Sequence, residues 1–106
     1  MFGLFKKDDS KSLKVNDIDE LIGKIELVDI REPYEYTGGS LKGAKNIPMQ
    51  KLISNPSKYM KENKTYYVIC HSGSRSGRTC RYLTKLGYDV VNVTGGYGSY
   101  VGNKRK

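Results

Sequence analysis

Hydrophobic residues along the chain gather in short runs that predict strands, separated by polar and glycine-rich segments. Thr65-Tyr66-Tyr67-Val68-Ile69 is the most β-prone stretch, and its apolar residues are continuous, as in a strand buried on both faces. Two further runs, 25–30 and 89–93, also have the apolar character of strands, and each is followed by polar or glycine-rich residues. The pattern therefore predicts strands at these three places, with the 65–69 strand at the centre.

The segments between these strands carry helical spacing. Asn16 is a good N-cap for a helix over residues 16–23. The last predicted helix, which ends at Gly87, carries Cys80, Leu83 and Leu86 on one face. Strands that alternate with helices indicate the α/β class, with a small, mostly parallel central sheet and helices on both faces. The predicted helical segments are residues 16–23, a turn opened by Pro33, residues 49–53, residues 57–61, and a helix that ends at Gly87.

The 106 residues correspond to one domain, since typical domains contain roughly 100–150 residues. Residues 1–12 show no periodicity that would bury a face, so we expect a flexible N-terminal arm. We place a single domain at 13–103 and a basic tail at 104–106.

The charge balance favours anionic ligands but does not choose among them. The formal net charge is +8, and a field of this sign attracts small inorganic anions, nucleic acids and lipid headgroups alike. The first five residues are apolar where a secretory signal would be basic, and no run reaches the roughly 20 residues of a membrane helix. We therefore expect a cytoplasmic protein that does not bind membranes.

Cys70 stands where the predicted central strand ends, the position at which open α/β sheets bind ligands. Ser72, Gly73 and Ser74 allow the chain to curl so that successive backbone N–H groups converge on the sulfur, with a helix N-terminus behind them. Such a nest stabilises a thiolate. We therefore expect Cys70 to have a lowered pKa and to react as a nucleophile, with positive charge from Arg75, Arg78 and His71.

Each cysteine also has a simpler interpretation. Cys70 could be a small side chain packed at a strand end, although the glycine and serines that follow it favour reactivity. Cys80 shares a face with leucines, so we expect buried packing for it rather than a resolving thiol. His71 beside Cys70 does not favour a zinc site, because neighbouring loop residues rarely aim at one point and no further ligand is visible.

Four segments together resemble the single-domain rhodaneses, sulfurtransferases that carry a sulfane sulfur as a cysteine persulfide. Residues 70–76, Cys-His-Ser-Gly-Ser-Arg-Ser, look like the active-site loop of that family. Residues 28–36, residues 43–48 and Gly95-Gly96 with an aromatic residue four positions on are similar to its other signatures, in the right order. The chain departs from the family in Ser40-Leu41, where His-Ile is usual, and in Tyr100, where tryptophan is usual.

The resemblance implies a rhodanese-like fold and a role for each matching residue. Cys70 would accept the sulfur from an anionic donor such as thiosulfate or a persulfide, and pass it to cyanide or to a thiol, which could belong to a protein. Asp29 and Arg31 would support the structure, and no metal or organic cofactor is implied. The persulfide would be held by the loop that comprises His71, Ser72, Gly73, Ser74, Arg75 and Ser76.

Three other functions compete with sulfur transfer. A cysteine phosphatase or arsenate reductase also uses a thiolate in a nest, but it places its arginine six residues after the cysteine, whereas Arg75 is five residues after Cys70. A rhodanese-like binding module without catalysis is the second alternative. Tyrosines interspersed with basic residues would suit the third, a nucleic-acid binder, but the basic residues are spread along the chain, so we expect no nucleic-acid partner.

Overall fold

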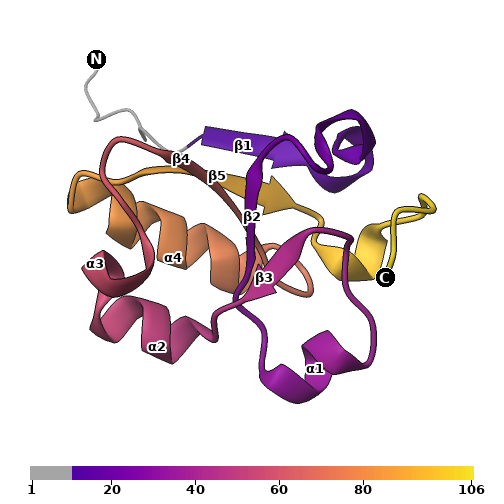
Figure 1. The fold of residues 1–106 in the computed structure, drawn as a ribbon, viewed down its shortest axis with the longest axis horizontal. Coiled ribbons are helices and arrows are strands. Elements are labelled where there is room, and N and C mark those ends of the chain that lie inside the picture. The colour runs from indigo at the N-terminus through magenta and orange to yellow at the C-terminus, as the bar shows by residue number, and fades with distance from the viewer. Residues whose placement is uncertain (1–10) are drawn as a thin grey trace, which may run out of the picture.

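A parallel sheet organises the part of the chain that the computed structural model describes, residues 11–106 (Figure 1). It has five strands in the order β1-β5-β4-β2-β3, and every neighbouring pair is parallel. This confirms the predicted α/β class. The strands are β1 (Lys11–Lys14), β2 (Glu26–Asp29), β3 (Ala44–Asn46), β4 (Thr65–Ile69) and β5 (Asp89–Thr94).

Helices cover both faces of the sheet. A first core cluster packs α2, α3 and α4 against one face, and includes Leu52, Val68 and Leu83. A second packs the other face against the turns that follow β1 and the C-terminal segment, and includes Ile18 and Ile69. The helices are α1 (Pro33–Thr37), α2 (Met49–Ser54), α3 (Pro56–Tyr59) and α4 (Ser74–Lys85), with short 3₁₀ helices η1 (Val15–Asp17), η2 (Asp19–Leu21) and η3 (Tyr97–Ser99).

Strand β4 lies at the centre of the sheet, between β5 and β2, as its continuous apolar run predicts. Its side chains alternate between the two cores, with Tyr66 and Val68 in the first cluster and Tyr67 and Ile69 against the second. Cys70 follows directly, so the fold places it at the carboxyl end of the central strand.

The helix predicted over 16–23 is wrong. The segment forms the two separate 3₁₀ turns η1 and η2, and Asn16 does not cap a helix. Its side chain instead donates to the Ser99 carbonyl at 3.0 Å and accepts from the Val101 amide at 2.9 Å. These contacts with the C-terminal segment, and the complete burial of Ile18, prevail over the local helical spacing.

The sheet begins at Lys11, two residues before the domain start predicted at residue 13, because Lys11 and Ser12 pair with β5. The rest of the predicted arm, residues 1–10, lies outside the described residues. Within residues 11–106 no helix has both the length and the apolar composition needed to cross a membrane.

Helix α4 differs from the predicted pattern at its end. Cys80 and Leu83 are fully buried, whereas Leu86, expected on the same face, is 46% exposed. Leu86 already lies beyond the helix, which ends at Lys85, and Gly87 follows with a φ of 99°. Gly87 therefore reverses the chain towards β5, as predicted.

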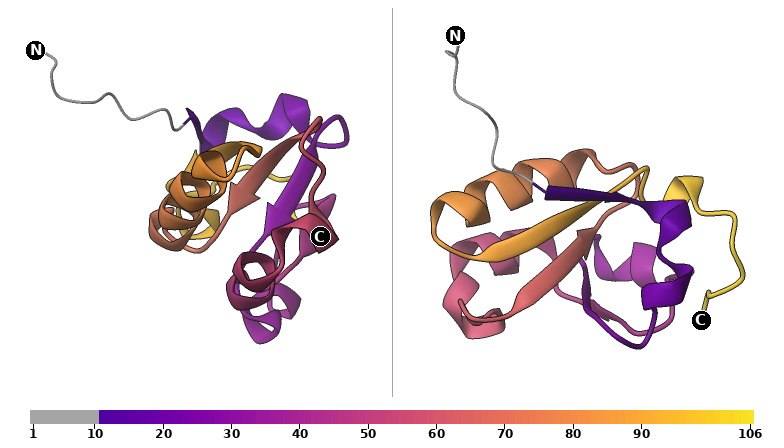
Figure 2. Two further views of the ribbon diagram at one scale, coloured as in Figure 1. Left: turned by 90° about the vertical axis from the view of Figure 1, so that its left-hand side faces the viewer. Right: turned by 90° about the horizontal axis from the view of Figure 1, so that it is seen from above.

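The C-terminal segment folds back on the turns after β1, as Figure 2 shows from above. The Tyr100 hydroxyl donates to Asp19 at 2.6 Å and accepts from the Lys104 amide at 2.8 Å. The tail pairs with residues 40–42, since the Lys106 amide donates to the Ser40 carbonyl at 2.9 Å. The residues at which the chain departs from the family signatures, Ser40-Leu41 and Tyr100, thus lie in this C-terminal packing, and Leu41 and Tyr100 belong to the second core cluster rather than to that of Cys70.

Candidate active site

Cys70 lies under a loop whose polar hydrogens point at its sulfur. The Gly73 amide donates to Cys70 Sγ at 3.1 Å, and the Ser76 amide does so at 3.3 Å. The Ser76 hydroxyl is also 3.3 Å from Sγ. The last two donors belong to the first turn of α4, so a helix N-terminus faces the sulfur. This is the nest that the loop composition predicts.

Two glycines make this geometry possible. Gly73 has a φ of 94°, which turns the chain back towards the sulfur before α4 begins. Gly96 has a φ of 66°, and a Cβ there would lie 2.3 Å from the His71 carbonyl oxygen. The turn at Gly95-Gly96 therefore packs against the backbone of the Cys70 loop. The Tyr97 amide, directly after this turn, donates to the Cys70 carbonyl at 2.9 Å.

The surroundings of the sulfur act on the pKa of Cys70 in opposite directions. Burial raises it, because the residue has no exposed surface and a thiolate is poorly solvated there. The hydroxyl of Ser76 and the amides of Ser76, Gly73 and Ser72 lower it, and together they prevail. The pKa of Cys70 therefore lies below that of an ordinary thiol, as expected for a nucleophile.

The positive charges predicted around Cys70 have other partners. Arg75 forms a bidentate ion pair with Glu35 of α1, with both N–O distances at 3.1 Å. Arg78 donates to the Ser74 hydroxyl at 3.1 Å. The groups that contact the sulfur are thus neutral hydrogen-bond donors, and Glu35 offsets part of the positive charge that Arg75 brings near it.

The remaining loop residues shape the loop itself. The Ser72 hydroxyl accepts from the Ser74 amide at 3.3 Å, which tightens the turn before α4. His71 packs its imidazole against Gly98, whose amide donates to the His71 carbonyl at 2.8 Å. Of the predicted loop amides, those of Gly73 and Ser76 lie within hydrogen-bond distance of Sγ, whereas that of Ser74 serves Ser72.

Asp29 and Arg31 form a buried ion pair where β2 ends. The Arg31 Nη2 lies 2.8 Å from Asp29 Oδ2, and the two side chains are 4% and 1% exposed. Arg31 also donates to the Gly39 carbonyl at 2.6 Å, and its guanidinium lies 4.5 Å from the centre of the Tyr97 ring. The pair thus joins the loops after β2 to the turn that supports Cys70.

Cys80 lacks the features of a reactive thiol. It is fully buried among apolar residues of the first core cluster. Burial raises the pKa of Cys80 to about 12. This agrees with the predicted packing role.

The comparison with known families identifies this architecture. The model of the Rhodanese-like domain matches residues 14–103. The chain belongs to the rhodanese-like domain family. Cys70 and the loop around it lie within the matched residues.

The relatives of this rhodanese-like domain include proteins named for sulfur transfer. A sulfurtransferase of Allochromatium vinosum is 35% identical over 91 residues, which cover 83% of this chain and 80% of that protein. The crystal structure of SSP1007 from Staphylococcus saprophyticus superimposes with a TM-score of 0.81 at 33% identity, covering 91% of this chain and 98% of the other. The chain spans between 39% and 80% of the length of five of its bacterial relatives.

A phosphatase is also similar over a shorter segment. M-phase inducer phosphatase 1 of Mus musculus is 38% identical over 71 residues, which cover 59% of this chain and 14% of that protein. This likeness covers less of the rhodanese-like domain than the likeness to the sulfurtransferase does.

Two residues of the site were missed in the sequence. Glu35 and Asn92 reach the Cys70 loop through Arg75 and Ser76, from elements distant in the chain. Asn92 interrupts a run of valines in a core strand, and a polar residue at such a position needs a buried partner. That signal could have pointed to it, whereas nothing local marks Glu35 as a partner of the loop.

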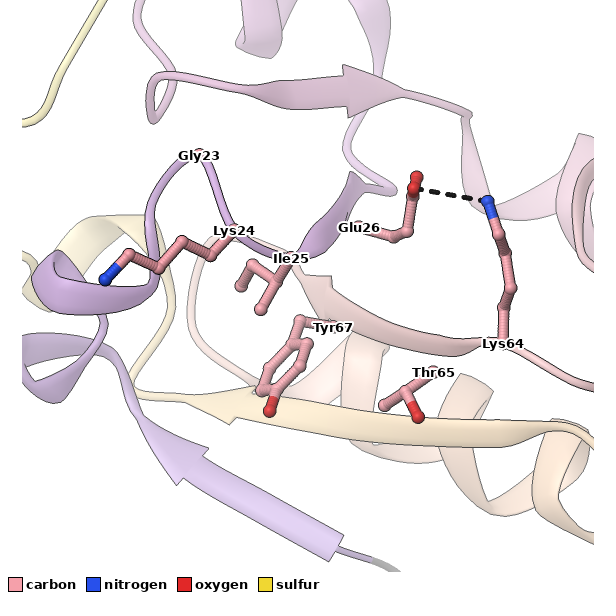
Figure 3. A pocket seen from close by; sticks show the side chains of 7 residues that line it. All are labelled: Gly23, Lys24, Ile25, Glu26, Lys64, Thr65 and Tyr67. Carbon is pink, nitrogen blue, oxygen red and sulfur yellow. Dashed lines mark hydrogen bonds and ion pairs between the residues drawn. The ribbon is translucent and has the colours of Figure 1, made fainter.

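Figure 3 shows a pocket remote from this chemistry. It surrounds the amino-terminal ends of β2 and β4, whereas Cys70 follows the carboxyl end of β4. Glu26 and Lys64 approach to 3.4 Å across it. The pocket has neither a cysteine nor a histidine in its lining, so we do not assign the active site to it.

The two thiols should react very differently with iodoacetamide. Alkylation of Cys70 should reach its plateau at lower pH than that of a free thiol, since the thiolate fraction rises as pH passes a pKa that lies below the ordinary value. Cys80, with a pKa of about 12, has a thiolate fraction of about one part in 10⁵ near neutrality. The check is peptide mapping after alkylation across a pH series, with glutathione as reference. A Cys70 profile that coincides with that of glutathione would contradict the nest.

Proposed function

We propose that this protein is a sulfurtransferase that carries a sulfane sulfur as a persulfide on Cys70. The observation that carries the proposal is the set of hydrogen-bond donors around Cys70 Sγ, from Gly73 and Ser76. Donors held in place before the reaction stabilise the thiolate without reorganisation, and the thiolate is the nucleophilic form. Membership of the rhodanese-like family, with relatives named for sulfur transfer, supports the same reaction class.

In the first half-reaction the Cys70 thiolate attacks the outer sulfur of an anionic donor such as thiosulfate. The Sγ–S bond forms while the S–S bond of thiosulfate breaks, and sulfite leaves with the bonding electron pair. The negative charge then lies on the outer sulfur of the persulfide. Loop amides from His71 to Ser76 that do not reach Sγ are candidates to hold that atom.

In the second half-reaction an acceptor removes the outer sulfur. Cyanide attacks it, the Sγ–S bond breaks, and thiocyanate leaves while the electron pair returns to Cys70 as the thiolate. A thiol acceptor, small or on a protein, would take the sulfur in the same way. The partners we propose are therefore a small anionic sulfur donor and a thiol, in the cytoplasm, with neither nucleic acid nor membrane involved.

The donor must first reach a sulfur that has no exposed surface. The 71–76 loop covers Cys70, and the ion pair between Arg75 and Glu35 ties this loop to α1. We propose that the anionic donor competes with Glu35 for the Arg75 guanidinium as it enters, because a thiosulfate oxygen and a carboxylate offer the same kind of acceptor. Entry would then open the loop and supply the cation that the resting site lacks.

Steady-state kinetics test this proposal. A double displacement predicts parallel double-reciprocal lines when thiosulfate is varied at several cyanide concentrations and thiocyanate is measured. The Cys80→Ser variant should retain the rate, because Cys80 lies in the core and takes no part in transfer. Intersecting lines, or no thiocyanate with either thiosulfate or a persulfide donor, would contradict the proposal.

The phosphatase alternative deserves its own assay because of the likeness to M-phase inducer phosphatase 1. Arg75 is five residues after Cys70 and is engaged by Glu35, which disfavours a loop that encircles a phosphate. We expect no hydrolysis of p-nitrophenyl phosphate above background. Hydrolysis that disappears in Cys70→Ser would favour the phosphatase instead. A non-catalytic binding module would show neither activity.

A further inference from the structure

Asn92, on β5, reaches the Cys70 loop through two hydrogen bonds. It lies opposite Val68 in the sheet register, and it shares a face of β5 with Val90, which belongs to the same core cluster as Cys70. Its Oδ1 lies 2.5 Å from the Ser76 hydroxyl oxygen, and its Nδ2 lies 3.3 Å from the Gly73 carbonyl oxygen. Asn92 therefore contacts both residues that donate to Cys70 Sγ.

The orientation of the Asn92 amide follows from what its neighbours can do. The Gly73 carbonyl can only accept a hydrogen bond, so the NH₂ group of Asn92 must face it. Oδ1 then faces the Ser76 hydroxyl. At 2.5 Å two oxygens without a hydrogen between them would repel each other, so the Ser76 hydroxyl donates to Asn92 in this arrangement.

The Ser76 hydroxyl has two acceptors but only one hydrogen. Besides Asn92 Oδ1 it lies 3.3 Å from Cys70 Sγ, a distance at which it can donate to a sulfur. When Cys70 is a neutral thiol, the S–H group can donate to the Ser76 oxygen while Ser76 donates to Asn92. When Cys70 is a thiolate, the charged sulfur is the stronger acceptor for the hydrogen.

We infer that Ser76 and Asn92 form a hydrogen-bond switch in which the Ser76 hydroxyl turns between Asn92 Oδ1 and Cys70 Sγ as the charge on the sulfur changes. Asn92 is the positioning residue of this switch. It acts on Cys70 through Ser76 and does not itself touch the sulfur.

This inference rests on the proposed function and deepens it, because sulfur transfer changes the charge on Sγ twice in each cycle. In the form that attacks the donor Sγ is the thiolate, and the Ser76 hydrogen lies on it. Once the Sγ–S bond has formed, the charge is on the outer sulfur and Sγ is uncharged, so the hydrogen returns to Asn92. When the acceptor removes the outer sulfur, the electron pair returns to Sγ and the hydrogen follows. No proton leaves Ser76 at any step.

Asn92 should therefore favour the neutral states of Sγ over the thiolate. In an Asn92→Ala variant the hydroxyl loses its competing acceptor and is free to donate to the thiolate. At a pH well below the pKa of Cys70, alkylation by iodoacetamide should then become about three- to tenfold faster, the factor that corresponds to one hydrogen bond. Ser76→Ala should slow it by a similar factor. At high pH, where the thiolate is fully formed, the rates should converge.

A double-mutant cycle separates this switch from a purely structural role of Asn92. In the Ser76→Ala background, Asn92→Ala should change the alkylation rate at low pH less than about twofold, because the hydroxyl through which Asn92 acts is gone. The same change in both backgrounds would overturn the inference, since Asn92 would then act through the Gly73 carbonyl. No change in either background would overturn it as well. If Asn92→Ala does not fold, Asn92→Val, which matches the neighbouring valines of β5, takes its place.

This test needs no sulfur transfer, so its outcome is independent of the proposed function. Sulfur loading of the wild type by thiosulfate, followed by intact mass, tests the function alone. Loading without coupling between Ser76 and Asn92 would reject the switch and keep the sulfurtransferase. Coupling without loading by either thiosulfate or a persulfide donor would reject the sulfurtransferase and keep a switch that responds to ionisation of the thiol.

Discussion

Replacing Arg31 with methionine should lower the free energy of unfolding by about 3–5 kcal/mol. The Asp29 carboxylate would lose the side-chain hydrogen bonds from Arg31 while remaining almost completely buried. A buried charge without a partner is far more costly than the intact pair is stabilising. The Gly39 carbonyl would also lose its donor at 2.6 Å. Urea denaturation of the two proteins measures the difference.

Arg81→Met is the matched control for this prediction. Arg81 is exposed on α4, so the same change of side chain should alter stability by no more than about 0.5 kcal/mol. A loss below about 1 kcal/mol for Arg31→Met would mean that Asp29 finds another partner or takes up a proton at little cost. In that case the ion pair between Asp29 and Arg31 would not be needed to hold the loops after β2 against the turn that supports Cys70.

Gly96→Ala should both destabilise the protein and disable the candidate site. The backbone at Gly96, with φ 66° and ψ −173°, is a conformation that residues with a side chain rarely adopt. The new methyl group would also lie 2.3 Å from the His71 carbonyl oxygen and 2.6 Å from that of Cys70. Relief of these contacts requires a shift of the backbone at Cys70 and His71. We expect the free energy of unfolding to fall by roughly 3 kcal/mol. Alkylation of Cys70 should then no longer reach its plateau at lower pH than alkylation of a free thiol does.

Gly43→Ala separates the steric effect from backbone strain alone. Gly43 has a φ of 79°, but nothing lies within 4 Å of a Cβ built there. Its substitution should cost roughly 1–2 kcal/mol and leave the alkylation profile of Cys70 unchanged. If Gly96→Ala behaves like Gly43→Ala in both measurements, the close approach of the glycine turn to the Cys70 loop is not needed.

The sequence predicted those parts of the fold that depend on local pattern. The continuous apolar run of residues 65–69 identified the central strand. Pro33 marked the start of α1, and Gly87 marked where the chain reverses after α4. The helix predicted after Asn16 failed because the local spacing of isoleucines and leucines is compatible with two 3₁₀ turns. The contacts of Asn16 with Ser99 and Val101, more than 80 residues away in the chain, are not visible in a local pattern.

The site was predictable where it is local and unpredictable where it is not. The Gly and Ser residues after Cys70 indicated a nest, because backbone amides that lie close in sequence can converge on one atom. The charge of the site was not predictable in this way. Glu35 lies 40 residues before Arg75 in the chain, and only the fold brings α1 beside the loop and pairs the two.

Sulfur transfer by this protein requires that sulfur become covalently attached to Cys70, and intact mass spectrometry after incubation with thiosulfate measures this directly. We expect the wild-type protein to gain one sulfur, about 32 Da, and to lose it on addition of cyanide. The Cys70→Ser variant should show no gain in mass. The Cys80→Ser variant should load like the wild type. A wild-type mass that stays unchanged with thiosulfate and with a persulfide donor, or a gain that persists in Cys70→Ser, would contradict the account.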